Sequence, residues 1–579
     1  MSGIFKLPTS LPPPSPVTHL HYQPLYPTDG QVSDVDVVDF IRRSQISFLV
    51  QPTGRRWWVP SRSYMRVRFE LTQPVGATNG GGSYLGTQFC EVLGASPCAA
   101  LFRGARFMVG TQEISVINNF LPQINAMKLR TSKSGAYLRE IESKRSGFVS
   151  DPYSASGQAT GASSVRGFDS KTHNQVTSRS FPAMGSTDGS GITTDIAAGA
   201  AGQETHFIRS DIENGTTRTY TYEFLWTPPL GIFDYHGALP GADYRLELHP
   251  DPDALRNLLI ATMGHGEQPA ATVAALRRSL KIQSMEFHCC EVEGPRGDDE
   301  KFVLDIADWQ MIPRQVSLGN DSSIQESYTL PMATEAVAFA MVNVTATPGE
   351  ASLGYGPQFF YNRIGALSPS IQPDGTLTGG GNRILANAPH LLQYSVWNKE
   401  IALRQSPYTS PFSSYYIEYG GRKRPLRTPD LVGNNAIYTN GMDFQESFEA
   451  DDLLGAVLPF YNINTAGGNA ARDGRSAVNK WAEEWQRTHQ NTGLWFTEGG
   501  CETYEEWNNR GPFLYFRWPR DGTNNATRLN FFATSKKRVD YTAVRSYLGM
   551  FALAKKGVRI TTQGSRVLNV EVSNRTKRG

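Results

Sequence analysis

Apolar and polar residues alternate with a period of two along many short segments of this chain. Residues 63–72 are a clear case, because every second side chain is apolar and the ones between are mostly polar. Such alternation is typical of a β-strand with one buried face. The apolar face consists of Met65, Val67, Phe69 and Leu71. Further strands are predicted at residues 218–226, 244–249, 279–292, 336–345, 414–419, 513–518, 528–533, 547–553, 557–562 and 566–572.

The strand predicted at residues 279–292 changes register part-way. Leu280 and Ile282 lie on one face, but the next apolar residue of that face is Met285, three positions later. One extra residue in one strand of an antiparallel pair forms a β-bulge. We therefore expect a bulge between Ile282 and Met285.

Helical spacing of apolar residues is confined to four short segments. None of them alternates regularly with strands, as a parallel α/β sheet would require. The pattern therefore predicts an all-β fold with short helices and long loops between the strands. The candidate helices are residues 119–130, 252–263, 269–280 and 476–490.

The chain of 579 residues exceeds what one hydrophobic core usually supports, so two large domains are expected. Residues 150–203 are dominated by Gly, Ser, Ala and Thr and are interpreted as a long loop within the first domain. A polar stretch then separates the halves. The predicted division is a Pro-rich N-terminal arm at 1–35, a first β-sandwich at 36–312, a linker at 313–327, a second β-sandwich at 328–572 and a short basic tail at 573–579.

Charge and cysteine content exclude several classes. The formal net charge is only +2, and the one terminal basic cluster is Arg575, Lys577 and Arg578, too short for an arm that neutralises packaged nucleic acid. The five cysteines include no CxxC pair, so neither a disulfide framework nor a zinc site is indicated. No apolar run approaches the roughly 20 residues that span a bilayer, and we expect no membrane insertion.

No residue pattern points to catalysis, and we predict no catalytic, cofactor-binding or metal-binding residues and no cofactor. His288, Cys289 and Cys290 resemble metal ligands, but neighbours on a strand point to opposite faces, which favours a buried cluster. The adjacent acids Glu505 and Glu506 cannot converge on one substrate atom. Clustered aromatic residues such as Trp57 and Trp58 are more typical of core or interface packing than of ligand stacking.

One short motif remains as a binding candidate. Arg296, Gly297 and Asp298 form an Arg-Gly-Asp triplet in a predicted loop. Such triplets bind integrins in some proteins, so these three residues are a candidate receptor-binding site.

The order of the segments resembles that of the double jelly-roll major capsid proteins of tailless icosahedral DNA viruses. The likeness is to Polinton/adintovirus-like elements and virophages, with adenovirus hexon more distant, and it extends from about residue 36 to residue 572. Its motifs are loose, and the segment at Phe107-Met108-Val109-Gly110 lacks the family's Asn. The other matching segments include Trp57-Trp58-Val59-Pro60, Tyr244-Arg245-Leu246-Glu247-Leu248, Tyr328-Thr329-Leu330-Pro331, Tyr416-Ile417-Glu418-Tyr419-Gly420-Gly421 and Tyr547-Leu548-Gly549-Met550-Phe551.

The resemblance implies two consecutive eight-stranded jelly-roll β-sandwiches, at 36–312 and 328–572, and a structural role without enzymatic activity. Three chains would form a pseudo-hexagonal homotrimer. The expected partners are neighbouring capsomers and the penton and minor capsid proteins, with at most weak contact to packaged DNA. The expected location is the virion capsid, after synthesis in the host cell and assembly in the nucleus or a cytoplasmic factory.

Two other functions stay open from the sequence. The first is a single jelly-roll capsid protein of a small DNA virus, and the number of sandwiches distinguishes it. The second is a carbohydrate-binding or carbohydrate-active β-sandwich protein, which would need convergent carboxylates or a calcium cluster.

Overall fold

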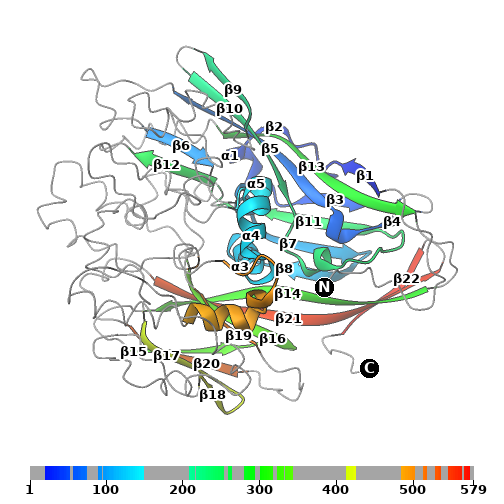
Figure 1. Ribbon diagram of the computed structural model, residues 1–579. Helices are drawn as coiled ribbons and strands as arrows, with labels where there is room; N and C mark the ends of the chain where they lie inside the picture. Colours follow the sequence, from blue (N-terminus) through cyan, green and yellow to red (C-terminus); the bar gives the residue numbers. More distant parts are fainter. Residues whose placement is uncertain are drawn as a thin grey trace, which may run out of the picture.

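The fold was analysed in a computed structural model of the full chain (Figure 1). Two β-sandwiches follow one another along the sequence and pack together. The structure describes residues 20–52, 56–74, 89–93, 96–148, 208–214, 217–252, 254, 258–263, 280–293, 300–316, 323–331, 333–342, 412–425, 484–502, 507, 513–517, 528–535, 546–563 and 566–573.

The first sandwich consists of a seven-stranded and a four-stranded sheet. The larger sheet has the order β1-β13-β5-β10-β9, with β2 and β4 also paired to β13. The smaller sheet has the order β3-β11-β7-β8. Bounds in the larger sheet are β1 (Leu20–Leu25), β2 (Ser33–Asp36), β4 (Arg56–Trp58), β5 (Tyr64–Pro74), β9 (Ile208–Asn214), β10 (Thr217–Trp226) and β13 (Leu280–Glu293). Bounds in the smaller sheet are β3 (Ile46–Val50), β7 (Phe102–Val109), β8 (Gln112–Ile117) and β11 (Tyr244–Pro250).

The second sandwich repeats this arrangement. One sheet has the order β14-β21-β16-β19, with β22 paired to β21, and the facing sheet has the order β15-β20-β17-β18. The bounds are β14 (Glu300–Val316), β15 (Ser323–Thr329), β16 (Thr334–Val342), β17 (Phe412–Tyr419), β18 (Arg422–Arg424), β19 (Phe513–Arg517), β20 (Arg528–Ser535), β21 (Ser546–Gln563) and β22 (Arg566–Ser573).

The two halves share one topology. Eight strands in each half occupy equivalent positions. In chain order they are β1 with β2, β3, β5, β7, β8, β10, β11 and β13 in the first half, and β14 to β21 in the second. In each half the first of these strands lies beside the eighth, the eighth beside the third and the third beside the sixth, while the facing sheet has the order second-seventh-fourth-fifth. In the first half β1 and β2 together act as the first strand, since both pair with β13. Strands that cross repeatedly between two antiparallel sheets in this way define a jelly roll. Both halves are jelly rolls.

Short helices and small elements connect the strands. They are α1 (Val37–Phe40), α2 (Pro97–Ala100), α3 (Leu121–Ser132), α4 (Gly135–Tyr137), a π-helical turn (Leu138–Glu142), α5 (Ser143–Ser146), the 3-10 turns Pro60–Arg62, Gly231–Asp234 and Leu494–Phe496, a helix at residues 484–492, and the strand pair β6 (Phe89–Leu93) and β12 (Leu259–Met263).

The alternating pattern correctly predicted the core of the first jelly roll. The apolar side chains of β5 are fully buried, and β13 has its register shift between Ile282 and Ser284, within the predicted bulge. Trp58 stacks on Phe107 with ring centroids 5.0 Å apart, so this tryptophan is a core residue, as predicted.

The predicted domain boundaries were wrong at the join. Strand β14 begins at Glu300 and pairs with β21 along its whole length, so residues 300–312 belong to the second jelly roll. The predicted linker at 313–327 contains the end of β14 and the start of β15. Pro313 lies within β14, which is an edge strand, where proline is tolerated because one side of the backbone needs no partner. At the other end, β1 and β2 place part of the predicted arm at 1–35 in the first sheet.

The predicted helices had mixed outcomes. The helix predicted at 119–130 agrees with α3, and the one predicted at 476–490 agrees with the helix at 484–492. The helix predicted at 252–263 was wrong at its end, because residues 259–263 form strand β12, which pairs with β6. Of the segment 269–280 only Leu280 is described, as the start of β13, and the loop predicted at 150–203 lies outside the described residues.

Candidate functional site

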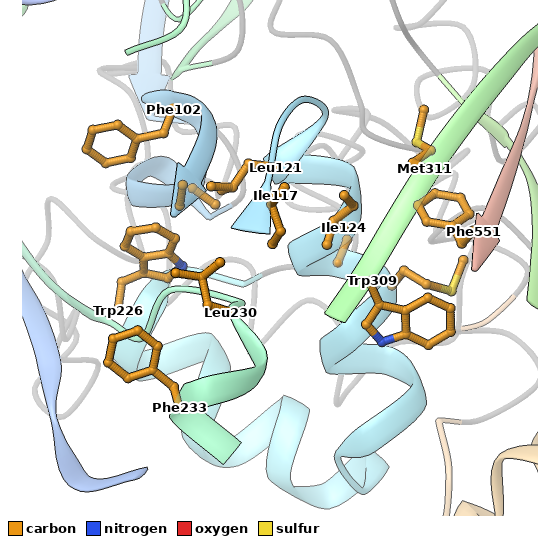
Figure 2. Close-up of a cluster of buried hydrophobic side chains, with 14 of the residues drawn as sticks. Phe102, Ile117, Leu121, Ile124, Trp226, Leu230, Phe233, Trp309, Met311 and Phe551 are labelled. Carbon is orange, nitrogen blue, oxygen red and sulfur yellow. The ribbon is translucent and has the colours of Figure 1, made fainter. Parts of the chain in front are cut away.

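The two sandwiches meet in a contact that combines apolar packing with buried charged side chains. Strand β8, helix α3 and the turn Gly231–Asp234 of the first half pack against β14, the edge strand of the second half. Figure 2 shows Leu121 and Ile124 of α3 on one side of this contact, and Trp309, Met311 and Phe551 on the other. All of these side chains are buried within one continuous hydrophobic core. We call this contact the joint.

A buried carboxylate fixes β14 against β8. The Asp308 side chain is fully buried and accepts hydrogen bonds from the Ser115 hydroxyl (2.5 Å), the Gly231 amide (2.8 Å) and the Val116 amide (3.3 Å). The Lys556 ammonium lies 3.5 Å away on β21. A buried charge is tolerated only when it is hydrogen-bonded and paired in this way. Asp308 therefore determines how β14 lies against the first jelly roll.

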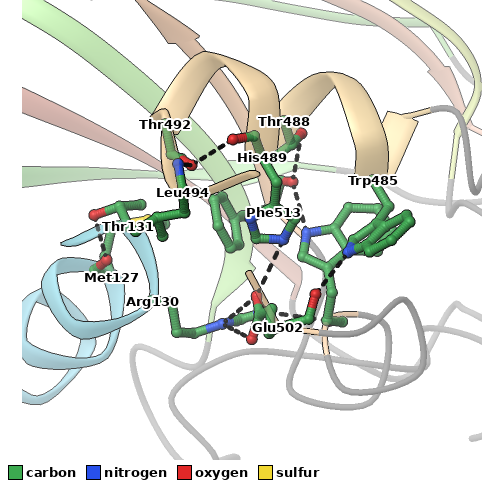
Figure 3. A network of polar contacts seen from close by, with 11 residues as sticks. Met127, Arg130, Thr131, Trp485, Thr488, His489, Thr492, Leu494, Glu502 and Phe513 are labelled. Atoms are coloured by element: carbon green, nitrogen blue, oxygen red, sulfur yellow. Dashed lines mark hydrogen bonds and ion pairs between the residues drawn. The ribbon is translucent and has the colours of Figure 1, made fainter. Parts of the chain in front are cut away.

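A second buried charge connects α3 to the segment between β18 and β19. The Arg130 Nη2 atom donates to the Glu502 Oε1 atom at 2.9 Å, and its Nε atom lies 3.1 Å from both carboxylate oxygens (Figure 3). The two side chains are 1% and 0% exposed. Arg130 also donates to the Trp507 carbonyl at 3.2 Å and lies over the Phe513 ring, 4.7 Å from its centroid. Such planar, bidentate geometry gives directional specificity.

Aromatic and imidazole side chains enclose the Glu502 carboxylate. The His489 Nε2 atom lies 3.6 Å from Glu502 Oε1, and both side chains are completely buried. The Trp485 indole donates to the Glu502 carbonyl at 3.0 Å, and the His489 ring meets Phe513 edge-on. These neighbours keep the carboxylate out of contact with solvent, so its hydrogen bonds from Arg130 lie in a surrounding of low polarity, where they are stronger than in water.

The backbones also approach each other closely at the joint. Gly135, the first residue of α4, donates its amide to the Gly500 carbonyl at 3.0 Å. A Cβ atom at position 135 would lie only 2.3 Å from the Cys501 carbonyl oxygen. Only glycine fits at this position, which fixes the distance between the two halves.

These contacts make the joint a rigid structural connection. Buried ion pairs contribute little net stability compared with apolar residues, but removing one partner is costly, so they select one relative orientation of the parts they join. The two jelly rolls are therefore held in a single arrangement by apolar packing, two buried carboxylates and a glycine contact. The protein is a double jelly roll.

The double jelly roll places the predicted cluster at residues 288–290 within the first sandwich. Cys289 is in the core, while His288 lies on the other face, where its ring stacks on Tyr64 with centroids 5.0 Å apart. Burial raises the pKa of the Cys289 thiol above its ordinary value and keeps it protonated. Within the described parts of the chain, no three His, Cys, Asp or Glu side chains are grouped closely enough to hold a metal ion.

The remaining predicted sites lie elsewhere. Arg296, Gly297 and Asp298 lie outside the described residues, as do Glu505 and Glu506. Among the described helices, none is both long and apolar enough to cross a bilayer.

The residues of the joint were missed by sequence reasoning. Arg130 and Glu502 are separated by 372 positions, so no local pattern connects them. The one available signal was the place of Arg130 on the same face of a predicted helix as Met127, three residues earlier, where a buried side chain is expected.

Comparison with known proteins gave structural likenesses alone. No protein-family model and no curated protein matches the chain. A chain of the cryo-EM structure of the Sputnik virophage is 9% identical, with a TM-score of 0.49, covering 98% of this chain and 90% of that one. The major capsid protein of mavirus is 9% identical, with a TM-score of 0.44 and coverages of 99% and 93%. A chain of the PBCV-1 virus capsid is 10% identical, with a TM-score of 0.42 and coverage of 96% of both chains.

Proposed function

We propose that this protein is a major capsid protein, a structural subunit of the shell of an icosahedral DNA virus. The observation that carries the proposal is the repeated topology: two jelly rolls with one strand order, held at a fixed angle by a buried joint. A rigid pair of similar sandwiches is a building block for a regular surface. No catalytic step is part of the proposal.

Symmetry explains why a duplicated sandwich suits a shell. Most homo-oligomers close by rotation, so that the same surfaces meet in every copy. Three copies of a chain with two similar sandwiches present six similar sandwiches around one axis. The result is a homotrimer with a nearly hexagonal outline, and hexagonal tiles cover a surface without gaps. Neighbouring capsomers, penton proteins and minor capsid proteins are the partners that such a tile requires, and its place is the virion capsid.

The two alternatives differ in what they require. A single jelly-roll capsid protein is excluded, because the described strands form two complete jelly rolls. Jelly rolls also occur in lectin domains. Assembly into hexagonal particles that associate into sheets or shells therefore favours the capsid proposal, and binding to glycans favours a sugar-binding function.

The experiment is to purify the full chain and measure its mass by light scattering and its outline by negative-stain microscopy. We expect three times the 63.9 kDa mass of one chain, and particles with a hexagonal outline that associate into sheets or closed shells. A protein that remains monomeric at all concentrations, or that binds a glycan array as a monomer, would contradict the proposal.

Receptor binding by Arg296, Gly297 and Asp298 stays a proposal of its own. The triplet lies in the connection between β13 and β14, and thus between the two jelly rolls. Asp298→Glu should abolish integrin-dependent attachment of cells to the purified protein while leaving its oligomeric mass unchanged. Unchanged attachment of cells to this variant would eliminate the triplet as a receptor site.

A further inference from the structure

The joint uses a different side of each jelly roll. The first jelly roll contributes β8, its fifth strand, and α3, the helix that follows this strand. The second contributes β14, its first strand. Because the two halves share one topology, each has both kinds of side. The joint uses the segment between β18 and β19 at Glu502 and Gly500, while Phe496 of this segment and strand β1 lie outside the contacts described for the joint.

The surfaces outside these contacts can be identified from the strand order. In the second jelly roll the fifth strand is β18, and the described segment between it and β19 includes the helix at 484–492 and the turn Leu494–Phe496, the counterpart of α3. In the first jelly roll the first strand is β1 with β2, the counterpart of β14. Strand β1 and helix α3 lie on different sides of the first jelly roll (Figure 1).

Strand β1 carries exposed apolar side chains. Leu20, Tyr22 and the adjoining Tyr26 are 46%, 45% and 55% exposed. Tyr22 lies 5.9 Å from the Tyr64 ring, on which His288 stacks, so the aromatic surface continues onto β5 and β13. A sheet edge with an apolar surface promotes unwanted association unless something covers it. We call Leu20, Tyr22 and Tyr26 the β1 patch.

The counterpart of the β1 patch is covered. On β14, Trp309 and Met311 are only 4% and 7% exposed, and helix α3, with Ile124, packs beside this strand (Figure 2). The counterpart of α3 in the second jelly roll carries an apolar side chain that is largely exposed to solvent. Phe496, at the end of the turn Leu494–Phe496, is 68% exposed, more than any other large apolar side chain among the described residues.

We propose that the turn Leu494–Phe496 of one copy packs on the β1 patch of a second copy, with Phe496 against Tyr22. The contact between copies then repeats the joint within the chain: each jelly roll covers the first strand of the next one. A head-to-tail contact of this kind closes into a ring when its rotation permits. This inference rests on the proposed trimer and specifies which surfaces form it.

The test is the concentration dependence of the trimer in variants of the full chain, measured by sedimentation. Tyr22→Asp and Phe496→Asp each place a charge in the proposed contact, and each should raise the concentration at which half of the trimer dissociates at least about 10-fold, as expected for central interface residues. Val303→Asp is the matched control: Val303 is 55% exposed on β14 but lies outside the proposed contact, and its trimer should be unchanged. Thermal unfolding of each variant detects any loss of the monomer fold.

A double variant tests the pairing itself. Tyr22→Arg alone should weaken the trimer, while Tyr22→Arg combined with Phe496→Asp should restore at least part of its stability, because opposite charges then meet. A wild-type protein that forms no trimer would refute the proposed function. A trimer that both aspartate variants leave intact, or a double variant no stronger than its single variants, would refute only this contact.

Discussion

Breaking the buried ion pair at the joint should destabilise the protein strongly. In the variant Arg130→Met the Glu502 carboxylate loses its bidentate partner, whose nitrogen atoms lie 2.9 to 3.1 Å away, while it remains 0% exposed. The remaining neighbour is His489, at 3.6 Å. A charge that cannot reach water and has lost its partner is the costly element of this variant.

The expected loss is about 3–5 kcal/mol in the free energy of unfolding, the range for removing one member of a buried pair. The double variant Arg130→Met/Glu502→Met should lose much less, because apolar replacement of both members of a buried pair is often nearly neutral. The difference between the two variants isolates the cost of the stranded charge from the cost of altered packing.

A second ion pair in the same chain provides the control. The Arg42 Nη1 atom lies 3.1 Å from the Asp39 Oδ1 atom, but these side chains are 74% and 66% exposed. Arg42→Met should therefore cost no more than about 1 kcal/mol, as is usual for surface pairs. The two ion pairs have similar nitrogen–oxygen distances but differ in burial, so we expect a large loss of stability from breaking the buried pair and a small one from breaking the exposed pair.

The assay is urea unfolding followed by tryptophan fluorescence, because Trp485 donates to the Glu502 carbonyl and Trp507 accepts from Arg130. The joint should separate at lower urea in Arg130→Met than in the wild type or in Arg42→Met. If Arg130→Met and Arg42→Met unfold at the same urea concentration, the ion pair does not hold the two jelly rolls together and the reasoning fails.

Three further predictions concern the joint and the cores. Gly135→Ala should lower the free energy of unfolding by about 1–3 kcal/mol, and with it the melting temperature, because the new Cβ atom would lie 2.3 Å from a backbone oxygen. An unchanged melting temperature would show that the two halves can move apart at this point without cost. Asp308→Asn should cost about 1–3 kcal/mol by thermal unfolding. If the Asn oxygen keeps the donors of Oδ1, the amide nitrogen takes the place of Oδ2 and cannot accept from the Val116 amide or the Lys556 ammonium. Burial raises the pKa of the Cys98 thiol in the folded protein, so the thiol of the unfolded chain ionises at lower pH, and the free energy of unfolding falls as the pH rises above the ordinary thiol pKa of 9.0. In Cys98→Ala the free energy of unfolding, measured by urea titration, should fall less steeply with pH in this range. Equal slopes in the variant and the wild type would contradict this.

The strands could be predicted because their signal is local. In β5 the fully buried residues Met65, Val67, Phe69 and Leu71 follow a pattern of period two, and the bulge in β13 appears as one misplaced apolar residue. The order of the segments then indicated two sandwiches. The join was misplaced because the polar residues 319–323 were interpreted as the break between the halves, whereas the first strand of the second half, β14, begins at Glu300.

The joint could not be predicted because its partners are distant in sequence. Asp308 meets Ser115 across 193 positions, and Arg130 meets Glu502 across 372. Strand β12 was mistaken for a helix for a related reason: its pairing with β6 overrides the weak helical spacing of residues 252–263.

The pairing of β1 with β13 has a consequence for folding during synthesis. Leu20 lies opposite Val292, so β1 finds its neighbour in the sheet only after some 270 further residues have been made. The β1 strand must wait while the inner strands of its sheet assemble, and the nascent chain carries an unpaired apolar segment throughout that interval. Contacts between two nascent chains at this segment are thus a route to misassembly that chaperones would need to suppress.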